Sequence, residues 1–222
     1  RHAEYSVISS LDDDPAVPSP RLISIALQAV AKAQGVCLKA IQSSRKRSIA
    51  QLETWPGEHY KLLTGLVQVV NPQGVIEVGT GGGAGALCIK QALSNTGKLV
   101  TFDIDSWKVH SDNVLQETDF QDGRLVQYVG DLTQPSVFQQ HQALLEGADL
   151  IFIHAAKDGV MEQKLLDLLG TVSFQKSPLL AFDDIRVWNM LRIWRGIRRP
   201  KLDLTSFGHW TGTGLVDWNP PR

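Results

Sequence analysis

The sequence predicts an α/β fold: a doubly wound, mostly parallel sheet with a C-terminal antiparallel hairpin and an N-terminal helical annex. Three observations lead to this prediction. From Gly74 onward, short apolar runs alternate with helix-compatible segments over short connections, which is typical of a parallel sheet covered by helices on both faces. A glycine-rich loop follows the first run. No helical segment separates the last two runs, so they should pair as a hairpin.

The residues before Gly74 have a different character. Residues 1–20 carry Asp and Pro without a sustained period and are predicted to be a flexible lead. Ser19 is a suitable helix N-cap, and Pro20 suits a first helical turn. The stretch 22–38 is apolar nearly all round. A helix of this kind requires burial on more than one side, under the fold or against a second subunit, so a homodimer is one expectation.

The chain is expected to form one domain, with the lead at 1–20, the helical annex at 21–72 and the α/β core at 73–222. Apolar periodicity and turn residues place the individual elements. The main helices are expected at 22–38, 58–70, 84–93, 106–117, 136–145, 160–169 and 186–197. The strands are expected at 75–78, 99–103, 125–129, 150–154, 179–182, 202–207 and 213–218.

Composition restricts the function classes. The chain has 222 residues, of which 43% are hydrophobic and 20% charged, with a net charge of −1. This is enough for one sizeable core, and the small net charge argues against nucleic acid or a membrane as a partner. No secretory leader or membrane-spanning stretch is apparent, and Cys37 and Cys88 are expected to be reduced thiols. A cytoplasmic protein is therefore expected.

The glycine loop carries the strongest signal. Glycines let a backbone approach a ligand closely, and free N–H groups at a helix N-terminus favour polar or anionic groups. Gly79-x-Gly81-x-x-Ala84 fits the dinucleotide fingerprint. Glu77 extends the pattern to Glu-x-Gly-x-Gly-x-Gly, ending at Gly83. This second pattern resembles motif I of class I S-adenosylmethionine-dependent methyltransferases.

The resemblance implies an S-adenosylmethionine site formed by Glu77, Gly79, Thr80, Gly81 and Gly83. It also implies that the Glu77 carboxylate organises the loop and reaches the methionine ammonium of the cofactor, directly or through water. A parallel sheet that ends in an antiparallel hairpin is the layout of these enzymes. Dinucleotide-binding domains usually begin with their glycine loop, whereas here an annex precedes it. A nicotinamide-dependent oxidoreductase remains the nearest alternative enzyme.

Other candidate residues follow the ends of the second and third strands, where ligands bind in open parallel sheets. Asp103 is the first choice to accept hydrogen bonds from the ribose hydroxyls, with Asp105 second and Ile104 between them. In the resembled family, a Gly-Asp pair after the third strand lies beside the adenine, and here it is Gly130-Asp131. An N-cap or turn role for Asp131 is equally consistent with the sequence.

The ends of the fourth and fifth strands sharpen the resemblance. His154-Ala-Ala-Lys157 and Asp183-Asp184 resemble the metal-dependent O-methyltransferases of the catechol and caffeoyl-coenzyme A type. The resemblance implies that His154, Asp183 and Asp184 hold a divalent cation, that His154 also borders the cofactor, and that Lys157 is the general base. A hard cation such as Mg²⁺ or Mn²⁺ would bind the acceptor oxygen and lower the pKa of its hydroxyl.

His154 departs from the family pattern, which has aspartate at this position. Imidazole is a good ligand for Zn, Fe, Ni or Mn and a poor one for Mg or Ca. Three interpretations follow: a softer metal, a metal held mainly by Asp183 and Asp184, or a site that has lost metal and activity. Helix capping before the next helix is the alternative for the two aspartates.

The expected function is S-adenosylmethionine-dependent methylation of a hydroxyl group on a small molecule, assisted by a divalent cation. A non-catalytic cofactor-binding module of the same fold is the alternative from another class. Trp188, His209 and Trp210 are candidates for an aromatic wall around the acceptor. The Asn/Asp-Pro-Pro-Tyr/Phe tetrad of amino-methylating enzymes is absent, which disfavours methylation of a nucleobase or glutamine nitrogen.

Overall fold

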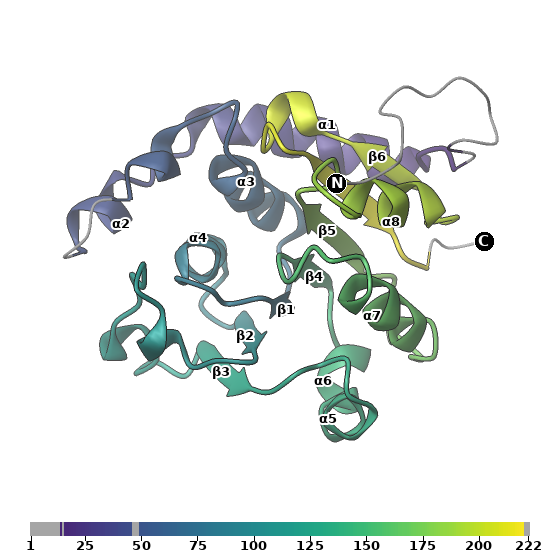
Figure 1. The fold of residues 1–222 in the computed structure, drawn as a ribbon. Coiled ribbons are helices and arrows are strands. Elements are labelled where there is room, and N and C mark those ends of the chain that lie inside the picture. The colour runs from purple at the N-terminus through teal and green to yellow at the C-terminus, as the bar shows by residue number, and fades with distance from the viewer. Residues whose placement is uncertain (1–13, 15, 46–48, 220–222) are drawn as a thin grey trace.

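A computed structural model describes residues 14, 16–45 and 49–219, so most of the predicted lead lies outside the described residues. The core is a seven-stranded sheet with the order β3-β2-β1-β4-β5-β7-β6 (Figure 1). The strands are β1 (Gly74–Val78), β2 (Lys98–Asp103), β3 (Leu125–Val129), β4 (Leu150–Ile153), β5 (Leu179–Asp183), β6 (Lys201–Asp203) and β7 (Thr213–Asp217). The predicted α/β fold class is confirmed.

A single strand of the sheet, β7, is reversed relative to the others. The pairs from β3 through β5 are all parallel, whereas β7 runs antiparallel to both β5 and β6. The predicted C-terminal hairpin is therefore confirmed. Because β7 is reversed, the loop that precedes it lies at the same edge of the sheet as the carboxyl ends of β4 and β5.

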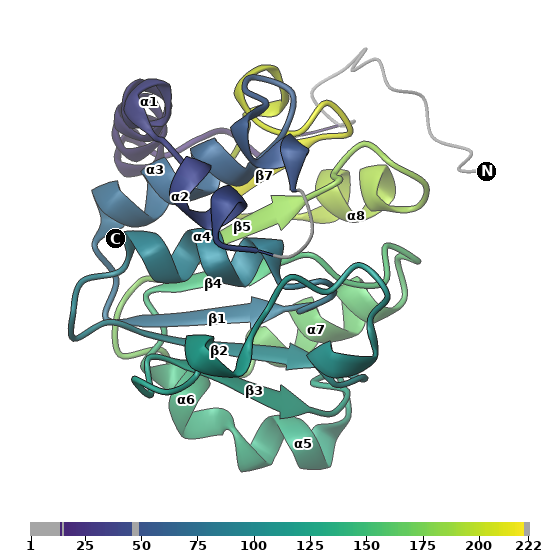
Figure 2. The same cartoon turned by 90° about the vertical axis from the view of Figure 1, so that its left-hand side faces the viewer.

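Helices cover both faces of the sheet, as expected for a parallel sheet with apolar strands (Figure 2). One face packs against α1, α3 and α4, and the other against α5 through α8. The helices are α1 (Pro20–Gly35), α2 (Lys39–Ser43), α3 (Tyr60–Val70), α4 (Ala84–Ala92), α5 (Pro135–Gln140), α6 (Gln142–Glu146), α7 (Met161–Leu169) and α8 (Met190–Gly196).

The N-terminal helix begins where the sequence predicts. Ser19 caps α1 by accepting a hydrogen bond from the Leu22 backbone N–H at 3.1 Å, and Pro20 occupies the first turn. The small residues of α1 allow α3 to approach closely: a Cβ added at Gly65 would lie 2.7 Å from the Ala29 carbonyl oxygen. Leu27 on the outer face of α1 remains 67% exposed. Within the described ranges, no helix is both long and apolar enough to cross a membrane.

The prediction of a helix at 106–117 is wrong. This stretch contains only two 3₁₀ turns, Trp107–Val109 and Glu117–Asp119. The Asn113 side chain accepts a hydrogen bond from the Leu115 backbone N–H at 2.8 Å, which favours a turn over a helix. The Val114 backbone N–H donates to the Gly82 carbonyl oxygen at 2.9 Å. The segment therefore lies along the glycine loop.

Three other element boundaries also differ from the sequence prediction. The helix expected at 136–145 divides at His141 into α5 and α6, and α8 begins at Met190 rather than at 186. The strand expected at 202–207 ends at Asp203, because the Asp203 carboxylate accepts a hydrogen bond from the Thr205 backbone N–H at 2.8 Å. A 3₁₀ turn, Thr205–Phe207, follows it.

Candidate active site

The glycine loop joins β1 to α4 at the carboxyl edge of the sheet. Gly79, Gly81 and Gly83 have φ angles of 97°, 47° and 85°, a region that L-amino acids other than glycine rarely adopt. A Cβ added at Gly79 would lie 2.0 Å from the His154 carbonyl oxygen, whereas one at Gly81 would meet nothing within 4 Å. The loop backbone therefore packs against the end of β4 at Gly79, whereas at Gly81 no atom of the described residues occupies the adjacent space.

Glu77 lies beneath this loop. Its side chain is buried, with 1% of the residue exposed, and its Oε2 atom has no hydrogen-bond partner among the described residues. Burial, opposed by a hydrogen bond from Thr101, raises the pKa of Glu77 to about 8. Thr80 also contacts Thr101, with their hydroxyl oxygens 2.7 Å apart. Buried carboxylate oxygens are normally partnered, so Glu77 is suited to a cationic ligand group.

Asp103 contacts the loop directly. Its Oδ2 atom accepts a hydrogen bond from the Gly81 backbone N–H at 2.9 Å, and its Oδ1 atom accepts one from the Asp105 N–H at 3.2 Å. Asp105 itself does not border the cavity beside the loop, whereas Asp103 and Ile104 do. The geometry therefore favours Asp103 over Asp105 as a ligand-binding residue.

Asp131 forms a local turn. It accepts hydrogen bonds from the Thr133 N–H at 2.8 Å, from the Thr133 hydroxyl at 2.7 Å and from the Gln134 amide at 3.0 Å. Burial would raise the pKa of Asp131, but these hydrogen bonds outweigh it and lower the pKa. The turn role considered from the sequence is thus present, and Asp131 also borders the cavity.

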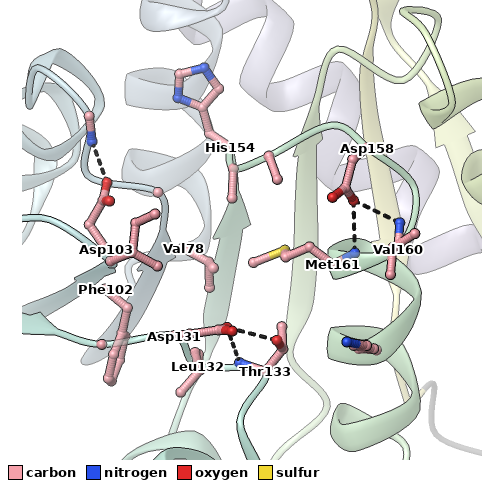
Figure 3. A pocket seen from close by; sticks show the side chains of 17 residues that line it. Val78, Phe102, Asp103, Asp131, Leu132, Thr133, His154, Asp158, Val160 and Met161 are labelled. Atoms are coloured by element: carbon pink, nitrogen blue, oxygen red, sulfur yellow. Dashed lines mark hydrogen bonds between the residues drawn. The ribbon is translucent and has the colours of Figure 1, made fainter.

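These residues surround a cavity of about 470 Å³. Asp103 and Asp131 lie on two sides of it, and Val78 lies between them (Figure 3). The predicted residues that border it are Gly79, Gly81, Asp103, Ile104, Gly130, Asp131 and His154. Thr80 and Gly83 border a smaller cavity of about 190 Å³, which His154 and Tyr60 also line. His154 therefore borders both cavities.

The ends of β4 and β5 bring the predicted metal and base residues together. His154 Nε2 lies 3.2 Å from Asp183 Oδ2, and Lys157 forms an ion pair with Asp184. One donor atom from each of His154, Asp183 and Asp184 lies within 4.8 Å of the others. Asp183 Oδ2 is buried and lacks a hydrogen bond in the described part of the chain. One imidazole and two carboxylates in this arrangement fit a divalent cation.

Sequence reasoning missed the residues that complete this cluster. His59, at the N-cap of α3, has its Nδ1 atom 3.4 Å from Asp183 Oδ1. His209, in the β6–β7 loop, was considered only as an aromatic wall. Its Nδ1 atom lies 3.0 Å from Asp183 Oδ1 and 3.2 Å from Asp184 Oδ1, and its Nε2 atom lies 3.5 Å from Glu58 Oε2. The sequence signal that could have indicated them is the pair Glu58-His59 directly before α3.

The electrostatics keep both aspartates ionised. Burial would raise the pKa of Asp183, but the neighbouring imidazoles, His59 first, hold it below its usual range. Burial acts likewise on Asp184, where hydrogen bonds from His209 and Lys157 hold the pKa well below its usual range. Burial opposes charge on His209, yet hydrogen bonds to the two aspartates raise its pKa to about 10. Two ionised carboxylates therefore lie together at this edge of the sheet, with a cationic His209 between them.

Comparisons with known proteins identify the family and support the fold. Residues 28–191 match the family model described as O-methyltransferase. A comparison with curated proteins yields no match. A methyltransferase from Geobacter sulfurreducens shares 18% identity, with a TM-score of 0.53 over 83% of this chain and 94% of that one.

Two other similar structures contain S-adenosylhomocysteine (SAH). A methyltransferase from Podospora anserina is 16% identical, with a TM-score of 0.53 over 92% of this chain and 91% of its own. An O-methyltransferase from Bacillus cereus is 17% identical, with a TM-score of 0.51 over 85% of this chain and 88% of its own. These likenesses concern the fold, whereas the family match spans most of the sequence. The chain belongs to the O-methyltransferase family.

Proposed function

We propose that this protein transfers a methyl group from S-adenosylmethionine to a hydroxyl of a small molecule, with the help of a divalent cation. The observation that carries the proposal is the position of His154. This residue borders the cavity formed by the glycine loop and Asp103, and it contacts Asp183 at 3.2 Å. The proposed cofactor pocket therefore adjoins the proposed base, Lys157, and the two aspartates.

The cavity and the residues next to it fit the cofactor in three respects. The Glu77 carboxylate has an unpartnered oxygen for the methionine ammonium. The open side of Gly81 leaves space for a ligand against the loop backbone. The Asp103 carboxylate accepts one hydrogen bond from the loop, at 2.9 Å, and its remaining lone pairs are available to ribose hydroxyls. Asp131 stands near Gly130 at the far end, where the adenine would lie.

The residues at the strand ends have separate roles in the proposed reaction. Methyl transfer is an in-line displacement, so the protein mainly positions the two reactants and keeps the nucleophile deprotonated. The ammonium of Lys157 first loses a proton to solvent, and the neutral Nζ then takes the proton of the acceptor hydroxyl. Asp184, which pairs with Lys157, orients it. A bound cation would supply charge stabilisation for the resulting alkoxide or phenolate, and His154, Asp183 and Asp184 would hold it.

The ligand set suits both hard and borderline divalent cations. Two carboxylates suit Mg²⁺ or Mn²⁺, whereas the imidazole of His154 favours Mn²⁺ or a softer metal over Mg²⁺. The exposed faces of Trp188 and Trp210, 58% and 65% exposed, support an apolar or aromatic wall for the acceptor.

The protonation of Glu77 predicts a pH dependence of cofactor binding. Its pKa is raised to about 8, so below that pH the unliganded carboxyl holds a proton that an ammonium partner would displace. Binding then releases a proton, and SAH affinity should fall about tenfold per pH unit as the pH decreases below about 8. Titration calorimetry at several pH values measures this slope. Glu77→Gln should remove it, and an unchanged slope in that variant would contradict the role of Glu77.

Titration with SAH is the central test, with NADH as the control ligand. We expect micromolar binding of SAH and none of NADH. Asp103→Ala should weaken SAH binding by about 10- to 100-fold, because it removes an ionised acceptor of ribose hydroxyls. Asp105→Ala is the matched control and should change affinity by less than about twofold. Binding of NADH without SAH would refute the proposed function.

A further inference from the structure

A second group of metal-ligand side chains lies beside the one already described. Glu58 and His59 precede α3, and His209 lies in the β6–β7 loop. Backbone pairing fixes the two segments: the Gly57 N–H donates to Gly208 at 3.0 Å, and the Trp210 N–H donates to Gly57 at 3.1 Å. One donor atom from each of the three side chains lies within 4.8 Å of the others.

The His59 side chain has no other evident role. It is 3% exposed, and neither ring nitrogen makes a hydrogen bond within the described residues. Its Nδ1 atom lies 3.4 Å from Asp183 Oδ1 without hydrogen-bond geometry. The ring packs against Tyr60 and Phe152, with centroids 4.3 Å and 5.6 Å away. Buried polar groups are nearly always partnered, so an unpartnered imidazole in such a cluster points to a ligand.

His209 is oriented in the way that metal-binding histidines usually are. Its Nδ1 atom lies 3.0 Å from Asp183 Oδ1 and 2.9 Å from the Thr211 hydroxyl. Its other nitrogen, Nε2, lies 3.5 Å from Glu58 Oε2. A histidine ligand commonly donates one N–H to a carboxylate, which fixes the ring, and its other nitrogen binds the metal as it releases its proton. Asp183 supplies that carboxylate here.

We propose that this cluster is a second metal site, which binds a borderline transition ion such as Zn²⁺ through Glu58, His59 and His209. Two imidazoles and one carboxylate favour Zn, Fe, Co or Ni over Mg and Ca. The site is distinct from the group formed by His154 with the two aspartates. Asp183 links them, since it contacts His59 and His209 through Oδ1 and His154 through Oδ2.

Cobalt(II) is a suitable probe, because its visible absorption reports coordination by nitrogen ligands and needs no methyl donor or acceptor. The experiment titrates the full chain with Co²⁺ alone and then displaces the ion with Zn²⁺. We expect His59→Ala and His209→Ala each to weaken Co²⁺ binding by at least about tenfold. His110→Ala is the matched control and should retain the full band, whereas His154→Ala should lose only the part of the absorption that arises from the site with the two aspartates. His59→Gln replaces His59→Ala if the alanine variant does not fold by circular dichroism.

Three outcomes overturn the inference. In the first, the full chain gives no visible band with Co²⁺. In the second, the band persists in His59→Ala and His209→Ala. In the third, His154→Ala loses the band together with those two variants, which would place the ion in one shared site rather than in a second one. The readout contains no cofactor, so failure here is distinguishable from failure of the proposed methyl transfer, which SAH titration tests separately.

Discussion

Replacing Lys157 with methionine should lower kcat by about 10²- to 10⁴-fold, because the substitution removes the proposed general base. Methionine keeps most of the length of the side chain. The backbone φ of 61° at Lys157 is unfavourable for both residues, so strain should change little. Transfer of a labelled methyl group from S-adenosylmethionine to a panel of hydroxylated acceptors measures the effect.

The control for this variant separates catalysis from binding. SAH affinity should stay within about threefold of that of the unmodified protein, because Lys157 does not border the cofactor cavity. Lys176→Met, which replaces a lysine 64% exposed in its side chain and paired with Asp149, should leave kcat unchanged. Undiminished turnover by Lys157→Met would remove this residue as the base.

Gly79→Ala should unfold the loop and abolish cofactor binding. The new Cβ would lie 2.0 Å from the His154 carbonyl oxygen, at a φ of 97° that alanine rarely adopts. Clash and backbone strain together should cost more than about 3 kcal/mol in the free energy of unfolding. SAH affinity should fall by more than about 100-fold. Urea unfolding and SAH titration measure the two effects.

Gly81→Ala is the matched comparison within the same loop. Its φ of 47° lies in the left-handed region that an alanine can occupy, and its Cβ would meet no protein atom within 4 Å. We expect a loss of only about 1–2 kcal/mol in stability. If Gly79→Ala proves as stable as Gly81→Ala, the close approach of the loop to β4 is not important for the fold.

Much of the fold was predictable because its strands are short apolar runs bounded by glycine and asparagine. Strand β1, the glycine loop and the C-terminal hairpin follow from such local signals. The failure at 106–117 has a tertiary cause. This segment has helix-compatible residues, but Val114 bonds to Gly82, and Leu115 packs so closely on Gly83 that a Cβ there would lie 2.3 Å away. The pattern of apolar and polar residues in the sequence does not indicate this contact.

The candidate site was predictable where strand ends define it. Asp103 and Asp183 end strands β2 and β5, and His154 directly follows β4. Parallel strands bring these carboxyl ends to one edge of the sheet. Their roles in binding and catalysis stay predictions. Glu58 and His59 were missed because they precede a helix in the annex, and only the folded chain brings them to His209, far away in the sequence.

The reversal of β7 separates two tasks along the edge of the sheet. The segments after β1, β2 and β3 form the proposed cofactor cavity together with the segment after β4, whereas those after β5 and before β7 belong to the side of the proposed chemistry alone. Trp210 lies in the connection that leads into β7 and is 65% exposed, so we expect substitutions of this side chain to affect the acceptor rather than the cofactor. We expect related enzymes to diverge in substrate through this loop while their cofactor side stays constant, so acceptor preference should be exchangeable by loop grafting.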